Sequence, residues 1–415
     1  VAPDSSRRRA LVGEFAELAR RHGFGEIVSP MFEDLGVFSR IGESTDIVNK
    51  EMFDFHDKGD PPQHLALRPE LTASICRAFA EHRPVVPWKV WYEGPQFRYE
   101  QPQAGRYRQF SQVGVEVLGT HDPLADVEVI AVARRFFESI GLRRVSLLVN
   151  SLGDPSCRPA YLEALASYLN ARRDELSPES RSTLEINPLR VLDSKRDVDQ
   201  PIITEAPSMV DHLSADTAEH FEAVCAGLDA LGIVYELSPR LVRGLDYYTR
   251  TTFELVADAL DTAQNAVGGG GRYDGLVAAL GGPATPGIGF ALGVDRILLA
   301  CDAEDVFPPP PPPVEVFVID VTGGVAGTLV CDELRAAGVS ADRAFDGRSM
   351  KAQMKVADRS GARLAILIGP DELAVDEVTL RDLRGEREQR RIPRADAVNE
   401  TWTELHSDAL FDQPG

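Results

Sequence analysis

Cysteine is scarce in this 415-residue sequence, and neither cysteine nor histidine occurs at a spacing typical of metal ligands. The five cysteines, at positions 76, 157, 225, 301 and 331, are scattered, which indicates a reducing compartment and gives no zinc signature. The eight histidines form no ligand pattern either. We therefore expect no transition metal held by protein side chains, only ions that arrive with a ligand.

Long apolar runs and an excess of basic residues are also absent. No segment approaches membrane-spanning length and no signal peptide is visible, so the sequence predicts a cytoplasmic protein without membrane contact. The net charge of −21 excludes binding of nucleic acid by overall attraction. Any contact with RNA must therefore come from a local group of cations.

Six consecutive prolines, Pro308–Pro313, divide the sequence. In polyproline II geometry they form a stiff spacer of roughly 19 Å, so we predict a linker at residues 307–313. Beyond it, buried strands and helices alternate. This pattern predicts a small α/β domain with a mainly parallel sheet over residues 314–415.

The residues before the linker predict an α+β domain. Together with the C-terminal α/β domain, this gives a chain that we place in the mixed α/β fold class. Its sheet is expected to be antiparallel, flanked by helices, and formed by residues 1–153 and 238–306. Residues 154–237 are predicted to be mostly helical, with prolines between the helical stretches. We interpret this region as an insertion.

The segment Trp88–Gly119 predicts two strands joined by a polar loop. In the returning strand, side chains alternate between two faces. One face points toward a core and carries Val113, Val115 and Val117. The other face carries Arg108, Phe110, Gln112, Gly114 and Glu116. This mixture suits a nucleotide and an amino acid, although a sheet with one solvated face is the commoner alternative.

Two features of this hairpin favour a ligand site over a wet surface. An aromatic ring, Phe110, gains nothing from facing water. Arg98, Arg106 and Arg108 also crowd one hairpin of an otherwise acidic chain. Guanidinium groups recognise phosphate through paired hydrogen bonds, and a nearby ring can stack on a base.

Two further stretches have ordinary structural explanations when they are taken alone. Glu70 and Thr72 precede a predicted helix, where Thr72 can cap the first turn and Glu70 can complement the helix dipole. The four glycines Gly268–Gly271 predict a turn in a flexible loop, and they are weak support for a site.

Three segments carry a pattern beyond local propensity: Phe97–Glu100 with Gly105–Phe110, Leu241–Glu254, and Gly287–Arg296. They resemble motif 2, the histidyl-specific signature Arg-Gly-Leu-Asp-Tyr-Tyr, and motif 3 of the histidyl-tRNA synthetase family, which is a class II aminoacyl-tRNA synthetase family. The resemblance covers essentially the whole chain.

The resemblance implies that ATP activates histidine, which is then transferred to tRNA(His). It implies that the catalytic residues Arg98 and Arg243 hold the α-phosphate. Arg106 and Arg296 would hold the distal phosphates, with adenine stacked between Phe110 and Arg296. ATP is expected to bring Mg²⁺.

The resemblance also implies a histidine site. Tyr248 and Glu116 would each bind one nitrogen of the imidazole, which a phenol and a carboxylate can satisfy together. The segment with Glu70 and Thr72 would receive the α-amino group. The complete implied set is Glu70, Thr72, Gln112, Glu116, Tyr247, Tyr248 and Tyr273.

Partners follow from the same resemblance. The first helix and the strand at 26–29 correspond to motif 1, which implies a homodimer, and residues 314–415 resemble an anticodon-binding domain. Gln103, Arg348 and Lys351 are predicted to contact tRNA, although basic residues such as the last two can equally form a solvated helix face. Gln101 stands where family members commonly have arginine, which puts recognition of the extra 5′ nucleotide of tRNA(His) in doubt.

The sequence disfavours three other functions. A regulatory subunit of ATP phosphoribosyltransferase generally lacks the C-terminal domain and degrades the arginine set, whereas this chain keeps both. A free-standing RNA- or histidine-binding sensor would have lost the ATP contacts. Another class IIa synthetase is disfavoured by the missing zinc ligands and by the histidyl signature.

Overall fold

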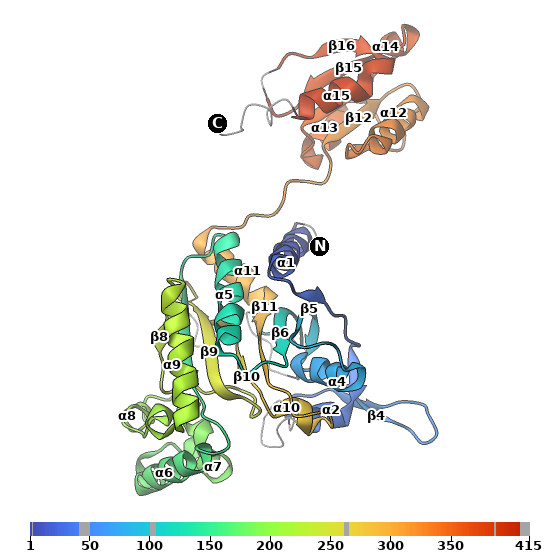
Figure 1. Cartoon of the computed structure of the whole chain (residues 1–415). Helices are drawn as coiled ribbons and strands as arrows, with labels where there is room; N and C mark the ends of the chain where they lie inside the picture. Colours follow the sequence, from blue (N-terminus) through green and yellow to red (C-terminus); the bar gives the residue numbers. More distant parts are fainter. Residues whose placement is uncertain (2, 41–49, 100–104, 261–264, 386, 407–415) are drawn as a thin grey trace. The chain divides into compact units, whose positions relative to one another are not determined.

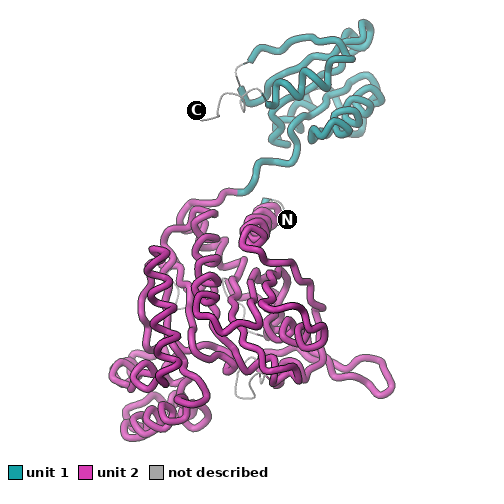
Figure 2. The backbone as a smooth tube through the Cα atoms, in the orientation of Figure 1, with its two compact units in different colours: residues 1–4, 309–415 teal, residues 5–308 magenta. Residues whose placement is uncertain are grey.

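The computed structural model describes residues 1, 3–40, 50–99, 105–260, 265–385 and 387–406 (Figure 1). The chain divides into two compact units, residues 5–308 and residues 309–415 together with 1–4 (Figure 2). The division follows Pro308, at the start of the run of six prolines. None of the helices in the described residues combines the length and apolar character that a bilayer crossing needs.

Residues 5–308 are built on an eight-stranded sheet in the order β1-β5-β6-β11-β10-β9-β7-β8. The outermost pairs, β1 with β5 and β7 with β8, are parallel, and the others are antiparallel. This antiparallel-rich sheet confirms the predicted fold class. The strands are β1 Gly25–Glu26, β5 Trp88–Phe97, β6 Gln109–Leu118, β7 Val145–Ser151, β8 Glu236–Leu237, β9 Thr249–Ala257, β10 Ala266–Arg272 and β11 Gly287–Gly293.

A smaller sheet and several helices complete this unit. The small sheet has the order β2-β4-β3, with β2 Phe32–Asp34, β3 Asp54–His56 and β4 His64–Leu67. The helices are α1 Asp4–Arg21, α2 Leu35–Ser39, α4 Thr72–His82, α5 Pro123–Ser139, α6 Arg158–Ala171, η1 Arg173–Glu175, α7 Pro178–Ile186, η2 Pro188–Asp193, α8 Gln200–Thr204, η3 Met209–His212, α9 Ala215–Ala230, α10 Leu276–Ala279 and α11 Val294–Glu304.

Apolar side chains from α1, α5, α9 and α11 pack in one cluster with those of the large sheet. Figure 1 shows where these helices lie relative to the strands. Val113, Val115 and Val117 of β6 point into this core, as their alternation predicted. Phe15 of α1 meets Phe136 of α5 edge to face, with 5.1 Å between ring centroids. Because this packing fixes β6, the side chains between the valines must face the opposite side of the sheet.

The glycine-rich segment is a strand, so the predicted turn is wrong. Gly268–Gly271 lie inside β10, paired with β9 and β11 on its two sides. A Cβ on Gly270 would lie 2.7 Å from the Cα of Phe290, and one on Gly271 would lie 2.7 Å from the carbonyl oxygen of Thr251. Glycine therefore permits a close approach of neighbouring backbones here.

The helical region 154–237 packs on both hydrophobic clusters of the unit. Val224 of α9 joins the core behind the sheet, next to side chains of α5. Leu165 of α6 joins a second cluster that also contains Tyr248 and Tyr273. The region is therefore continuous with the walls that carry the predicted histidine-binding tyrosines.

The C-terminal unit has a five-stranded sheet in the order β13-β12-β14-β15-β16. Its first three strands are parallel, but β15 and β16 are antiparallel additions, so the predicted mainly parallel sheet is only half correct. Helices pack on both faces. The elements are β12 Val316–Asp320, α12 Val325–Ala336, β13 Ala341–Arg343, α13 Met350–Ser360, β14 Leu364–Ile368, α14 Pro370–Ala374, β15 Glu377–Asp382, β16 Arg390–Pro393, η4 Arg394–Asp396 and α15 Ala397–His406.

The close packing of β10 generates a stability prediction. Gly270→Ala should destabilise the protein by about 1–3 kcal/mol, because the added methyl must push β10 and β11 apart. Gly13→Ala on the exposed side of α1 is the matched control, since a Cβ there meets nothing within 4 Å. The control should gain up to about 1 kcal/mol from helix propensity. Thermal unfolding measures both, and an equal response of the two variants would contradict the packing argument.

Candidate active site

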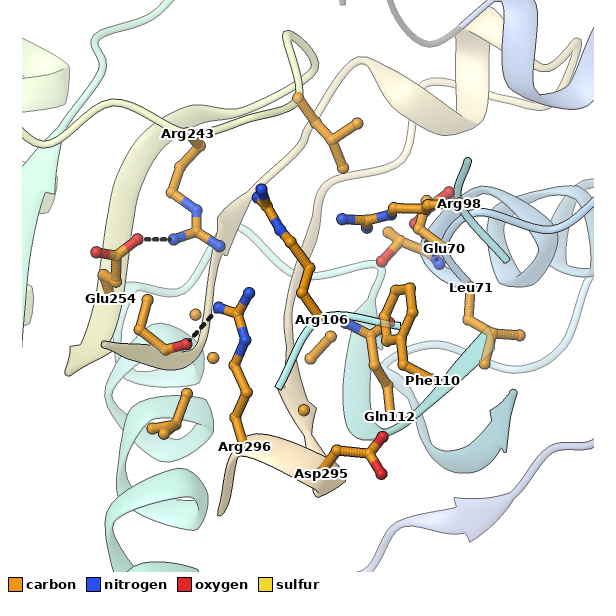
Figure 3. Close-up of a pocket in the computed structure, with 18 of the residues that line it drawn as sticks. Glu70, Leu71, Arg98, Arg106, Phe110, Gln112, Arg243, Glu254, Asp295 and Arg296 are labelled. Carbon is orange, nitrogen blue, oxygen red and sulfur yellow. Dashed lines mark hydrogen bonds and ion pairs between the residues drawn. The ribbon is translucent and has the colours of Figure 1, made fainter. Parts of the chain in front are cut away.

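A cleft of about 240 Å³ is lined by Phe110 and Gln112, on the face of β6 opposite the buried valines (Figure 3). Four arginines reach it from separate segments: Arg98 after β5, Arg106 before β6, Arg243 before β9 and Arg296 on α11. The structure thus brings together every residue predicted to bind ATP. Four cations in one cleft of an acidic chain make a local positive site that suits a polyphosphate.

Two of these arginines are held in place by backbone carbonyl groups. Arg296 donates from Nη1 to the oxygen of Ala266 at 2.8 Å and from Nε to that of Gly105 at 3.1 Å. Arg98 donates from Nε to the oxygen of Pro69 at 3.0 Å, and its guanidinium lies 5.2 Å from the centroid of the Phe110 ring. These bonds orient the planar groups before any ligand binds.

Arg243 is held by a carboxylate that the sequence analysis did not single out. Its Nη1 donates to Oε2 of Glu254 at 2.8 Å, and both side chains line the cleft (Figure 3). The guanidinium lies against Gly269, where a Cβ would be 2.7 Å from Nη1. Glu254 follows the buried Phe253 on β9. Strand alternation alone therefore indicated that Glu254 faces away from the core.

Glu116 of β6 is fully buried and lies behind the side chains that line the cleft. Its Oε1 accepts a hydrogen bond from the Thr72 hydroxyl at 2.6 Å, and its Oε2 accepts one from the Tyr273 hydroxyl. Burial raises the pKa of Glu116 to about 8, because the protein interior disfavours a charged carboxylate. This carboxyl group can therefore change protonation near neutral pH.

Three tyrosines form an aromatic wall beside this carboxyl group. The ring centroids of Tyr247 and Tyr248 are 4.6 Å apart, and those of Tyr247 and Tyr273 are 5.9 Å apart. Tyr247 and Tyr248 line the cleft, whereas Tyr273 lies behind it and reaches Glu116. Burial raises the pKa of each phenol, so all three are neutral donors at physiological pH.

The helix-capping expectation is half right. Both oxygens of Glu70 accept backbone N–H groups at the start of α4, from Thr72 at 2.7 Å and from Ala73 at 2.8 Å. The Glu70 side chain therefore caps the first turn, from the position before the N-cap residue Leu71, whereas Thr72 was the predicted cap. The Thr72 hydroxyl is directed to Glu116 instead. Both side chains line the cleft.

Gln112 also lines the cleft, and its Oε1 is buried without a hydrogen-bond partner in the described structure. A buried acceptor of this kind costs stability unless a ligand donates to it. Gln112 is thus ready to receive an N–H group. Gln112 is two residues after Phe110 on β6, so strand alternation directs both side chains to the same face of the sheet.

Other predicted residues are not among those that line the cleft. Arg108 is exposed and stacks on Tyr99, with 4.2 Å between its guanidinium carbon and the ring centroid. Arg348 and Lys351 are exposed in the C-terminal unit, at the start of α13. Gln101 and Gln103 fall outside the described residues. Among the described residues, no group of three or more His, Cys, Asp or Glu side chains is placed to hold a metal ion.

Comparison with known proteins decides the family. The histidyl-tRNA synthetase family model matches residues 1–297. The chain belongs to this family. An anticodon-binding-domain model matches residues 316–401 of the C-terminal unit.

Members of the histidyl-tRNA synthetase family match over nearly the whole chain. The histidine–tRNA ligase of Nocardia farcinica is 48% identical over 98% of this chain and 96% of its own length. That of Rhodococcus erythropolis is 48% identical over 96% and 94%. The crystal structure of apo S. aureus histidyl-tRNA synthetase superposes with a TM-score of 0.80 at 35% identity and covers 97% of each chain.

The buried Glu116 generates a prediction about pH. The folded protein keeps a proton on this carboxyl group that the unfolded chain releases above its ordinary pKa. Stability without ligand should therefore fall as the pH rises from about 5 to 8, by up to about 1.4 kcal/mol per unit from this group. Glu116→Gln removes this contribution, so its melting temperature should fall less over the same interval.

Calorimetry of both proteins at pH 5.5 and 7.5 measures the difference. Glu70 is a second buried carboxyl group with a raised pKa, and its charge also raises the pKa of Glu116. The comparison therefore measures Glu116 together with its interaction with Glu70. Parallel pH dependences of the two melting temperatures would show that Glu116 is already ionised in the free protein.

Proposed function

We propose that this protein activates histidine with ATP and transfers it to tRNA(His). The observation that carries the proposal is the convergence of four arginines on one cleft, with the hydrogen-bonded pair of Glu116 and Tyr273 buried behind its lining residues. The arginines match the charge of a triphosphate. The carboxyl group and the phenols match an imidazole, which has two nitrogens to satisfy.

In the first step a carboxylate oxygen of histidine attacks the α-phosphorus of ATP. A P–O bond forms, the bond to the β-phosphate oxygen breaks, and pyrophosphate leaves with histidyl-adenylate bound. Arg98 and Arg243 stabilise the negative charge that builds on the α-phosphate oxygens. Arg106 and Arg296 hold the departing phosphates, while adenine stacks between Phe110 and the Arg296 guanidinium.

The histidine is held by groups that face it from three segments. Tyr248 and Glu116 bind the imidazole, and Tyr273 orients the Glu116 carboxyl group. Glu70 and Thr72 receive the α-amino group together with Gln112, whose unpaired Oε1 accepts an N–H. Tyr247 forms the apolar side of the proposed histidine site. The protein forms no covalent bond, so positioning and charge account for the rate.

Magnesium is expected to enter with ATP. Mg²⁺ usually takes one or two carboxylates plus substrate phosphates, and the residues present fit that pattern. Glu254 is a carboxylate that lines the cleft beside Arg243, so it can supply an oxygen. The ion would neutralise phosphate charge, and Arg243 would do so at the α-phosphate.

In the second step a hydroxyl of the terminal tRNA ribose attacks the carbonyl carbon, and AMP leaves. Residues 1–153 and 238–306 act as the catalytic domain, and residues 154–237 as an insertion beside it. After the linker at 307–313, residues 314–415 bind the anticodon. Gln103, Arg348 and Lys351 contact the tRNA. Protein synthesis places this activity in the cytoplasm.

A homodimer is supported by exposed apolar side chains in the region that resembles motif 1. Val28, Met31 and Phe32 are 82%, 54% and 51% exposed. Phe55 on β3, which is separated from β2 by β4 in the small sheet, is 42% exposed and lies edge-on to Phe32. Exposed apolar side chains that are grouped in this way are typical of a protein–protein contact.

The function is tested by exchange of labelled pyrophosphate into ATP. Exchange should require histidine, and the other nineteen amino acids should support less than about a hundredth of its rate, since a site built on buried hydrogen bonds rejects ligands that leave them unmade. Histidine-independent exchange, or no exchange with any amino acid, would refute the proposal.

Arg243 tests the assignment of the catalytic group. Arg243→Ala should slow adenylate formation by about 10²-fold or more, because one preorganised cation is lost at the α-phosphate. Arg135→Ala on α5, whose side chain is 60% exposed, is the control and should exchange normally. Both should melt near the parent temperature. A normal exchange rate in Arg243→Ala would remove Arg243 from the mechanism.

A further inference from the structure

A buried ion pair lies next to the proposed histidine site and has no part in the mechanism so far. Arg272 ends β10 and Asp126 lies on α5, and both are completely buried. Arg272 reaches Oδ1 of Asp126 from Nη2 at 2.5 Å and Oδ2 from Nε at 3.1 Å. This two-point contact fixes the plane of the guanidinium.

The remaining N–H groups of Arg272 are also used. Nη1 donates to the carbonyl oxygen of Thr120 at 2.9 Å and meets Asp274 at 3.4 Å, and Nη2 donates to the carbonyl oxygen of Asp122 at 3.1 Å. These bonds tie the end of β10 to the turn before α5. The backbone at Arg272 therefore has little freedom to move.

The next residue in the chain carries this constraint into the site. Tyr273 is 1% exposed, and its hydroxyl donates to Glu116. Its backbone N–H is bonded to the oxygen of Gly287 at 2.8 Å. Because the tyrosine is bracketed by Arg272 on one side and by Asp274 on the other, the position of its hydroxyl depends on both neighbours. Asp274 accepts from the Gly287 N–H at 3.3 Å.

The other end of the ion pair reaches the helical region 154–237. Oδ2 of Asp126 also contacts Nε2 of His220, on α9, at 2.9 Å. His220 is only 8% exposed. One turn earlier on α9, Asp216 pairs with Arg250 at 2.5 Å, and Arg250 lies 3.8 Å from Asp274. Two contacts from α9 are thus linked to the two residues that flank Tyr273, one through Asp126 to Arg272 and the other through Arg250 to Asp274.

We propose that His220, Asp126 and Arg272 form a positioning chain that fixes the Tyr273 hydroxyl on Glu116 and thereby sets the affinity for histidine. None of the three touches a substrate. Their effect on the reaction passes through Tyr273 alone. The chain also makes α9 part of the wall that recognises histidine, although α9 lies in the region proposed as an insertion. This inference rests on the proposed histidine-binding role of Glu116 and Tyr273.

The energetic cost of the chain supports a role beyond stability. A buried ion pair gains little over a well-packed apolar pair of the same volume, because both charges must leave water. A guanidinium with fixed bonds does, however, hold the adjoining backbone more rigidly than an apolar contact can. We therefore expect the ion pair to contribute more to the affinity for histidine than to the free energy of unfolding.

The experiment uses the full-length protein and measures KM for histidine and for ATP by pyrophosphate exchange. His220→Leu removes the donor to Asp126 and should raise the histidine KM about three- to tenfold, with the ATP KM and kcat changed less than twofold. His220→Gln keeps a donor and should recover most of the affinity. His82→Leu, at the exposed end of α4, is the matched control and should change neither KM.

Asp126→Asn is the more severe variant and leaves Arg272 buried without its partner, so it can fail to fold. The decisive test is therefore a double-mutant cycle with Tyr273→Phe, which removes the hydroxyl itself. Tyr273→Phe should raise the histidine KM at least tenfold. In that background His220→Leu should have no further effect, because its influence passes through the missing hydroxyl.

Each outcome separates the two proposals. Additive effects of His220→Leu and Tyr273→Phe, or a lowered melting temperature with an unchanged histidine KM, overturn the positioning chain and leave the proposed function intact. An unchanged histidine KM in Tyr273→Phe overturns the histidine-site assignment itself, and the chain with it. Equal increases in the KM of histidine and ATP would show a structural role only.

Discussion

The structure depends on one sheet whose two faces are packed in opposite ways. Behind the sheet, valines of β6 and rings from α1 and α5 fill the space completely. In front, glycines of β10 and β11 leave no side chain, so backbones approach closely and a cleft remains. A Cβ at Gly269 would strike Arg243, and one at Gly289 would strike Glu116. The filled face supplies the rigidity that an open face of this kind lacks.

The cleft is also divided electrostatically. One side gathers four guanidinium groups, each reaching in from a different segment, in a chain whose net charge is −21. At the other side, Tyr247 and Tyr248 line the cleft in front of the buried Glu116, where desolvation raises the pKa of its carboxyl group. A triphosphate is thereby attracted to one side. An imidazole, which has one donor and one acceptor when neutral, is suited to the other side.

Local patterns predicted the parts of this site that depend on local geometry. The alternation along β6 placed Phe110, Gln112 and Glu116 on one face, because strand geometry fixes side-chain direction from sequence alone. Local patterns did not predict features of the structure that depend on tertiary contacts. Gly268–Gly271 were expected to form a turn, since glycine has low strand propensity. The structure shows why glycine is needed in this strand: the backbones of the neighbouring strands leave no room for a Cβ.

Two other differences have the same origin. Thr72 was the predicted cap of α4, but its hydroxyl is drawn to Glu116, 44 residues away in sequence, and Glu70 caps instead. Arg108 was grouped with the site arginines, yet it lies over Tyr99 outside the cleft. Spacing identifies which residues share a face, but not which partner each finds there. The resemblance to a known family therefore supplied the roles, and the packing supplied the contacts.

A site held by separated segments needs a means of keeping those segments in register. Hydrogen bonds to backbone carbonyls serve this purpose for Arg98 and Arg296. Buried charge serves it for β10, whose last residue is clamped to α5 by Asp126. An apolar contact at that position would allow the strand end to slide, because dispersion is not directional. A bidentate ion pair permits one geometry only. Directional contacts are therefore concentrated where the end of β10 places Tyr273 against Glu116, and nondirectional packing is left to the opposite face.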